Sequence, residues 1–217
     1  MTVASSFVCG AHDLLQFFLS TEMIGILGIA TCWNESAASR QTAAKMIMPH
    51  LAGSITMALG LLEVVELTGG LKIGLESTIN GFIVTALFIK LAIFPFMWYL
   101  SDIIRNGNVA VFYMLTAGKL AIIVQIAHWN WHDGYREVFW IGAVANALAC
   151  CYWVFQSNDY KEWQAAIVLG TSGTPLLFVA SNSVLYLHLY IVVASIVVFI
   201  FMRHREKSIL SDRKSVV

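Results

Sequence analysis

The sequence predicts an all-α protein that crosses a membrane about seven times. Of its 217 residues, 59% are hydrophobic and only 12% are charged, whereas about 25% of the residues of a typical soluble domain are charged. Apolar runs of roughly 20 residues, long enough to cross a bilayer as a helix, recur along the chain between short polar segments. We therefore expect a polytopic transmembrane helix bundle.

The predicted spans are separated by breaks with turn-forming composition, such as NESAASRQ and NWHDGYRE. No break is long enough to hold a soluble domain. The sequence therefore predicts one transmembrane helical domain over 1–203 and a polar tail over 204–217. The seven predicted spans are 14–33, 43–67, 78–100, 109–129, 138–156, 163–180 and 185–203.

The expected orientation follows from the basic residues outside the spans, because Lys and Arg accumulate in loops on the inner side of a membrane. Only Lys72 and Arg136 fall on the side opposite the C-terminus. We therefore expect the C-terminus inside and the N-terminus outside, which agrees with seven spans. The basic residues on the C-terminal side are Arg40, Arg105, Lys161, Arg203, Arg205, Lys207, Arg213 and Lys214.

Three charged residues, Glu22, Lys90 and Lys119, lie deep within predicted spans. At a rise of about 1.5 Å per residue, Glu22 is roughly 12 Å into its span, and each lysine is roughly 15–18 Å from one end. An isolated charge at that depth costs at least about 2.5 kcal/mol, and such residues usually mark ion or proton pathways. Burial disfavours a charged form and an opposite charge restores it. A Glu–Lys pair that opens and closes is therefore suited to stepwise proton movement.

The span 43–67 adds two further candidates, Lys45 and His50, and each has a structural alternative. Lys45 can extend to the inner interface while its stem stays in the apolar layer. His50 follows Pro49 and can be a buried histidine with satisfied hydrogen bonds.

Helix-breaking residues lie within two predicted spans. Pro95 follows Lys90 closely, and the stretch VLGTSGTP places Gly170 and Pro175 inside the span 163–180. Broken backbone at membrane depth is tolerated where it lines a cavity or is buried in protein. The alternative is a simple kink in which small residues allow close helix packing.

Other polar and aromatic groups have structural interpretations. We expect His128 and His132, among Trp129 and Trp131, to form an interfacial aromatic belt. The four cysteines lack metal-ligand spacing and are expected to be small apolar helix residues. We expect no metal site and no bound cofactor in this chain.

Four stretches of the chain, taken in order, resemble consecutive helices of one family. They are FFLSTEMIGILGIATCWNESAASRQTAAKMIMPHLAGS, FIKLAIFPFMWYLSDIIRNGN, AGKLAIIVQIA and WIGAVANALACCYWVFQSNDYKEWQAAIVLGTSGTPLLFV. An intramembrane Glu, a Lys, a Lys followed by Pro-Phe, and a central Lys occur in the same order in the antiporter-like subunits of respiratory complex I, the proton-pumping NADH:quinone oxidoreductase. The stretches resemble the fifth and sixth, the seventh, the eighth, and the ninth and tenth helices of these subunits.

The resemblance implies a role for each deep charge. Lys90 would be the central proton-handling lysine, Glu22 its partner, and Lys119 the next group along the membrane midplane. Pro95 would allow a local break. The chain itself would carry no redox chemistry, although the whole complex would use NADH, FMN, iron–sulfur clusters and ubiquinone. Its partners would be the lipid bilayer and other membrane-arm subunits, with no nucleic acid.

The sequence departs from the family in extent and in detail. The resemblance covers about the fifth to the eleventh helix of a longer inverted-repeat fold, which implies a shortened or split form completed by separate chains. We therefore expect the mitochondrial inner membrane, with the C-terminus in the matrix. Met97 stands where many relatives have His. Two alternatives stay open, namely a structural complex I subunit with a degenerated channel and a subunit of a cation/proton antiporter complex.

Overall fold

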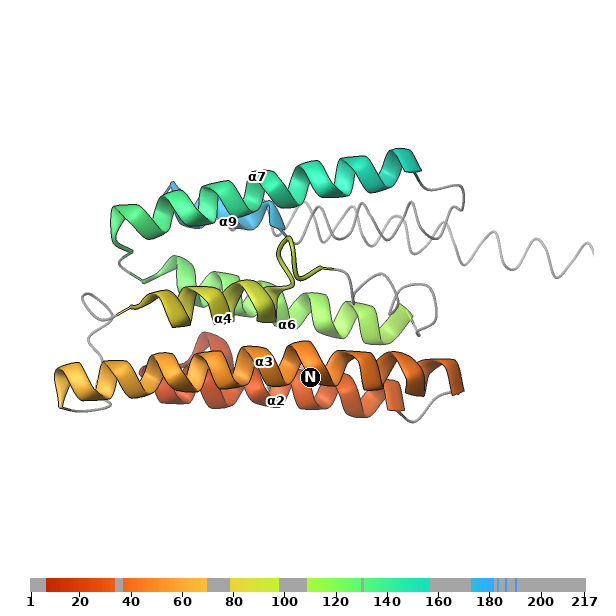
Figure 1. Ribbon diagram of the computed structural model, residues 1–217, viewed down its shortest axis with the longest axis horizontal. Coiled ribbons are helices and arrows are strands. Elements are labelled where there is room, and N and C mark those ends of the chain that lie inside the picture. Colours follow the sequence, from red (N-terminus) through yellow and green to blue (C-terminus); the bar gives the residue numbers. More distant parts are fainter. Residues whose placement is uncertain are drawn as a thin grey trace, which may run out of the picture.

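The computed structural model is a bundle of long helices arranged in three tiers (Figure 1). It describes residues 7–33, 37–69, 79–97, 109–129, 131–156 and 173–181, together with positions 183, 186 and 190. Within these residues the regular structure is helical and no strand occurs. The predicted fold class is therefore confirmed.

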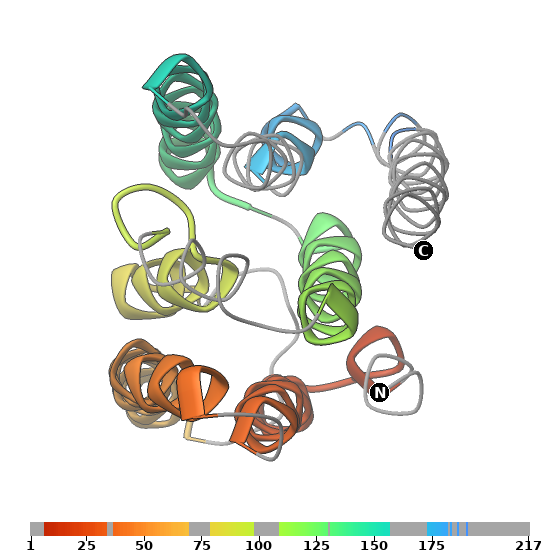
Figure 2. The same ribbon diagram turned by 90° about the vertical axis from the view of Figure 1, so that its right-hand side faces the viewer.

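The described elements pair up in space. In Figure 2, α3, α4 and α7 form one column of the bundle, and α2, α6 and α9 form the other. The middle tier, α4 and α6, is thus enclosed by helices above and below. The helices are α2 (Leu14–Trp33), α3 (Ala37–Thr68), α4 (Gly81–Leu91), α6 (Val109–Ala127), α7 (Asp133–Gln156) and α9 (Pro175–Ala180).

Three of the described helices are long and apolar enough to cross a membrane. They are Leu14–Trp33, the segment Arg40–Thr68 of α3, and Asp133–Gln156. The first has the bounds that the sequence predicts, whereas α3 and α7 begin a turn or more before the predicted spans 43–67 and 138–156. Gly170, most of the predicted spans 163–180 and 185–203, and the tail 204–217 lie outside the described residues.

The predicted span 78–100 is not one continuous helix, because α4 ends at Leu91, four residues before the break that the sequence predicts at Pro95. Asn80 caps its first turn by accepting a hydrogen bond from the Ile83 amide. At the other end Ala92 adopts a left-handed conformation (φ 53°, ψ 49°), and the Phe94–Pro95 peptide bond is cis. Proline cannot donate a helical hydrogen bond, and the left-handed turn at Ala92 stops the helix one residue after Lys90.

The aromatic residues at the α6–α7 connection belong to the core. Trp129 and Trp131 are buried, and their rings stack with centroids 5.6 Å apart. The rings of Phe17 and Trp129 meet edge to face with centroids 4.8 Å apart. Those of Phe139 and Trp131 do the same at 4.6 Å. The two tryptophans therefore join α2 to α7, and the prediction that they form an interfacial belt is wrong. Their neighbours His128 and His132 are exposed.

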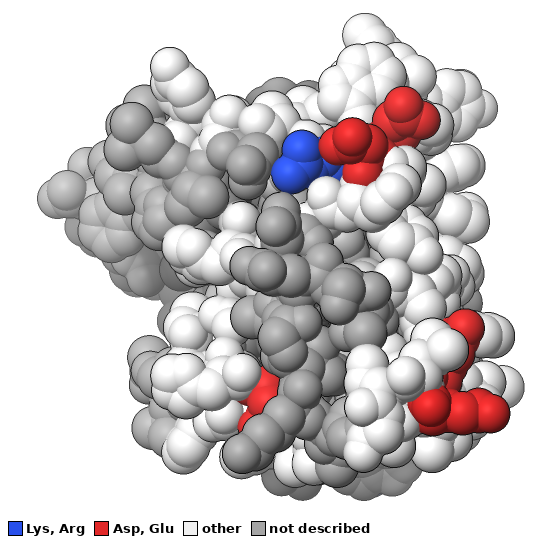
Figure 3. Space-filling model, turned by 90° about the vertical axis from the view of Figure 1, so that its left-hand side faces the viewer, with Lys and Arg blue, Asp and Glu red and all other residues white. Residues whose placement is uncertain are grey.

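One end of the bundle is mainly acidic (Figure 3). This is the end where α2 and α7 begin and α3 finishes. Arg40 and Lys45 lie near the start of α3, at the opposite end. The charged residues near the acidic end are Asp13, Glu63, Glu66, Asp133 and Glu137, with the basic Arg136.

Candidate functional site: a buried carboxylate with three partners

Glu22 and Lys90 form an ion pair in the interior of the bundle. Glu22 lies on α2 and Lys90 lies in the last turn of α4. The Lys90 Nζ donates to Glu22 Oε1 at 2.5 Å, and the side chains of Lys90 and Glu22 are 5% and 17% exposed, respectively. Each charge therefore depends mainly on protein partners, since little water reaches them.

The second carboxylate oxygen of Glu22 has two partners from α3. His50 Nε2 lies 3.1 Å from Glu22 Oε2, and the Ser54 hydroxyl donates to the same oxygen at 2.7 Å. Lys90 Nζ also lies 3.3 Å from Ser54 Oγ. Residues four apart share one face of a helix, so His50 and Ser54 reach the carboxylate together. One carboxylate thus joins three helices.

Two glycines make room for this arrangement. A Cβ atom added at Gly25 would overlap the His50 imidazole, and one added at Gly53 would lie 3.1 Å from Lys90 Cγ. Gly25 is one turn from Glu22 on α2, and Gly53 is one turn from His50 on α3. A larger side chain at either position would push a member of the cluster away from the carboxylate.

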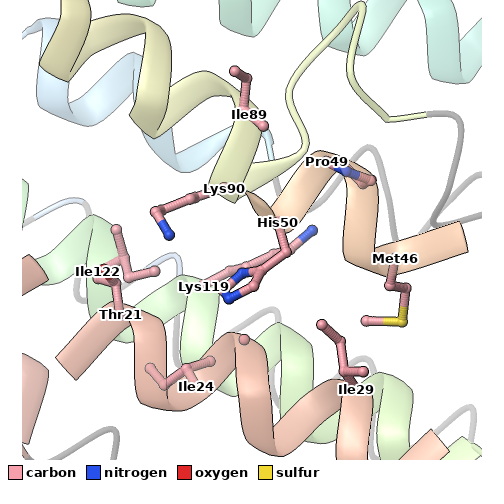
Figure 4. Close-up of a pocket in the computed structure, with 11 residues that line it drawn as sticks. Thr21, Ile24, Ile29, Met46, Pro49, His50, Ile89, Lys90, Lys119 and Ile122 are labelled. Atoms are coloured by element: carbon pink, nitrogen blue, oxygen red, sulfur yellow. The ribbon is translucent and has the colours of Figure 1, made fainter. Parts of the chain in front are cut away.

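Lys119 approaches the cluster from α6 across a small cavity. The cavity has a volume of about 50 Å³, which is enough for a few water molecules. Lys90, His50, Lys119 and Thr21 give it a polar part, and four isoleucines complete the wall together with Gly25, Met46 and Pro49. In Figure 4 the three basic side chains lie in the space between their helices. Lys119 is only 7% exposed.

The sequence-predicted residues divide into those at this site and those elsewhere. Glu22, Lys90 and His50 are in direct contact, and Lys119 shares their cavity. Lys45 is exposed on α3 and is not part of the cavity wall. Pro95 lies just beyond α4. Pro175 is the first residue of α9, and Thr174 before it keeps helical backbone angles (φ −55°, ψ −37°).

Ser54 is a site residue that the sequence reasoning missed. A serine in an apolar helix usually bonds to the carbonyl four residues earlier, and Ser54 does so with His50 at 2.8 Å. Its spacing from His50 was the available signal, because i and i+4 side chains lie on one face. Its contact with Glu22 depends on how α2 packs against α3, which the sequence of α3 alone does not encode.

The described part of the chain offers no metal site. It contains no group of three or more His, Cys, Asp or Glu side chains that could hold a metal ion. None of the four cysteines in this part of the chain forms a disulfide bond; Cys32 and Cys150 are buried, and Cys9 and Cys151 are exposed. What it does hold is a set of proton donors and acceptors, since a carboxylate, an amine, an imidazole and a hydroxyl meet at Glu22.

Comparison with solved structures finds the same fold in a chain of respiratory complex I from Thermus thermophilus, in a structure with bound aureothin. The TM-score is 0.71 at 14% sequence identity, and the alignment covers 88% of this chain and 47% of that one. The present chain thus spans about half the length of its structural relative. No protein-family model and no curated protein matches the sequence. At this identity the likeness shows a shared helix-bundle fold.

Proposed function

We propose that this chain is a non-redox, membrane-arm subunit of a proton-pumping NADH:quinone oxidoreductase. The observation that carries the proposal is the buried Glu22–Lys90 ion pair, whose carboxylate is shared with His50. Buried charges in a membrane bundle are costly and typically belong to ion or proton pathways. The fold shared with a complex I chain supports the same assignment.

The proposed proton step begins with the opening of the Glu22–Lys90 pair. Removing one partner of a buried ion pair costs about 3–5 kcal/mol when the remaining charge has nothing to replace it. Here Glu22 keeps His50 and Ser54 as partners if Lys90 moves away. The opening therefore costs less than it would for an isolated pair, and Lys90 can release its proton towards the cavity.

The cavity gives the released proton a direction. Lys90 and Lys119 line the same space, and water molecules within it would connect the two amines by hydrogen bonds. In its neutral form, Lys119 of α6 then takes the proton. The return of Lys90 to Glu22 favours the uptake of a new proton from water by Lys90. Glu22, Lys90 and Lys119 are the proposed proton-translocating residues, and His50 assists by holding Glu22.

A finer assignment follows from the sequence resemblance. Within the antiporter-like family, we propose that the chain corresponds to NADH–ubiquinone oxidoreductase chain 2. Its proposed location is the mitochondrial inner membrane, with the C-terminus on the matrix side and other membrane-arm subunits as partners.

A pair of lysine variants tests the pumping role. Lys90→Met removes the buried ammonium and keeps the side-chain length, whereas Lys45→Met makes the same change at an exposed position. We expect Lys90→Met to lower NADH-driven proton uptake into sealed vesicles by at least about tenfold per assembled complex, because methionine has no proton to release and the loss of a positioned proton-transfer group typically costs more than that factor. Lys45→Met is expected to pump normally.

The outcomes separate this proposal from its alternatives. Full pumping by Lys90→Met would leave the chain a structural subunit with a degenerated channel. Sodium- or potassium-dependent proton exchange that needs no NADH would instead assign the chain to a cation/proton antiporter complex.

A further inference from the structure

Asn146 is a fully buried polar residue in the middle of α7, with 1% of its surface exposed. It lies outside the Glu22 cluster. Buried carboxamides are retained where they satisfy hydrogen bonds that the backbone cannot make for itself. Two of the contacts of Asn146 are with other parts of the bundle, namely the segment that follows α4 and Gly173 before α9.

The first contact is with the broken segment after α4. The Phe94 amide donates to Asn146 Oδ1 at 3.2 Å. Because α4 ends at Leu91, the Phe94 amide has no place in the helical ladder and needs another acceptor. Phe94 is four residues after Lys90, so Asn146 fixes the backbone that directly follows the lysine.

The second contact is with Gly173, shortly before α9. A Cβ atom at Gly173 would overlap the Asn146 carboxamide, so the two residues pack with no space between them. Two residues later Pro175 begins α9. The Asn146 Nδ2 also lies 3.9 Å from Cys150 Sγ, one turn along α7. The carboxamide is therefore held between the segment that follows α4 and Gly173.

We propose that Asn146 is a positioning residue for Lys90. Its carboxamide ties the break that ends α4 to Gly173 before α9, and thereby sets where the last turn of α4 presents the lysine to Glu22. A movement of either segment changes the position of the other through this side chain. The consequence for pumping rests on the proposed function of Lys90, whereas the consequence for the position of the break does not.

The test compares two substitutions of similar size. Asn146→Asp keeps an oxygen that accepts from the Phe94 amide, and Asn146→Leu does not. Each is combined with Ile93→Cys, a position with no exposed surface in the broken segment. The labelling of this introduced cysteine by N-ethylmaleimide is followed by mass spectrometry in the assembled, membrane-embedded protein.

We expect slow labelling with Asn or Asp at position 146 and labelling about tenfold faster with Leu, a factor typical of losing one hydrogen bond. Ile126→Cys is the matched control, because this position on α6 is also fully buried and is expected to be unaffected. Equal labelling at position 93 in the Asp and Leu variants would overturn the proposal, because it would reduce Asn146 to a space-filling residue.

Gly173→Ala provides the second measurement and covers the case in which Asn146→Leu does not assemble. Its added methyl group meets the carboxamide, so we expect it to speed labelling of Ile93→Cys when Asn146 is present. With Ala at position 146 the methyl group has space, and Gly173→Ala is expected to change nothing further. If Gly173→Ala speeds labelling equally with Asn and with Ala at position 146, Asn146 does not connect Gly173 to the segment that follows α4.

Pumping by these variants separates the two proposals. If Lys90→Met pumps normally while labelling of Ile93→Cys follows position 146 as expected, the pumping role fails and the positioning role stands. If Lys90→Met fails to pump and labelling is insensitive to position 146, only the positioning role fails.

Discussion

Gly25→Ala tests the His50–Glu22 contact without altering any charge. The Cβ of an alanine at this position would overlap the His50 imidazole, so the ring has to turn away from α2. The imidazole then leaves Glu22 Oε2, which it approaches to 3.1 Å. The Glu22–Lys90 contact involves the other carboxylate oxygen and is not directly touched.

The expected effect follows from three terms, two unfavourable and one favourable. A hydrogen bond to a charged group contributes about 1.5–3 kcal/mol, which corresponds to a factor of roughly 10–150 in an equilibrium. Overpacking adds about 1–3 kcal/mol of strain. Alanine is favoured over glycine in a helix by about 1 kcal/mol, which offsets only part of this cost. We therefore expect proton uptake per assembled complex to fall at least about tenfold.

The assay is NADH-driven proton uptake in sealed vesicles, normalised to assembled complex. Gly81→Ala is the control, because nothing lies within 4 Å of a Cβ added there. His50→Ala makes room for the new methyl group, so Gly25→Ala should have no further effect in that background. Normal pumping by Gly25→Ala would refute the argument that His50 supports Glu22. If Gly25→Ala alone does not assemble but the double variant Gly25→Ala/His50→Ala does, the overlap with the His50 ring is the cause of the failure.

The other predictions concern the cavity and the helix contacts around it. Lys119→Met should lower proton uptake about as strongly as Lys90→Met, since both amines line the cavity, while assembly on native gels persists. Gly142→Ala should reduce the amount of assembled complex, because its methyl group would overlap the Phe88 ring, whereas Gly134→Ala meets only a contact at 3.8 Å and should assemble normally. Asn80→Ala should shorten the thermal half-life of the complex, because it removes an N-cap worth about 1 kcal/mol. It also removes the hydrogen bond that Asn80 Nδ2 donates to Oε2 of the half-buried Glu63 at 2.6 Å. Equal half-lives for Asn80→Ala and wild-type protein would argue against that cap.

The hydrophobicity and the length of the apolar runs were sufficient to predict most of the fold. Apolar runs located α2 at its observed bounds and indicated an all-helical bundle. The same signal failed for α4, because the residues after Leu91 are as apolar as those before it. The end of that helix depends on the left-handed backbone at Ala92. Trp129 and Trp131 were misjudged for a related reason, since an aromatic pair at a helix end suits both an interface and a core.

The depth of the charges in the sequence indicated which residues deserved a functional interpretation, but not how they pair. Glu22 and Lys90 are 68 positions apart, and their contact depends on the packing of α2 and α4 around α3. Ser54 and Asn146 are small, uncharged polar residues in apolar helices. Burying them costs less free energy than burying a charge, so their positions in the sequence do not indicate a function. Their roles depend on contacts with residues 32 and 52 positions away.

The central claim is that this chain belongs to a proton-pumping NADH:quinone oxidoreductase. The most direct measurement is native gel electrophoresis of gently solubilised membranes, followed by in-gel staining for NADH dehydrogenase activity and mass spectrometry of the stained band. The account predicts peptides of this chain in the high-mass NADH-oxidising band, together with those of other membrane-arm subunits. Peptides of this chain confined to a separate complex without NADH dehydrogenase activity would contradict it.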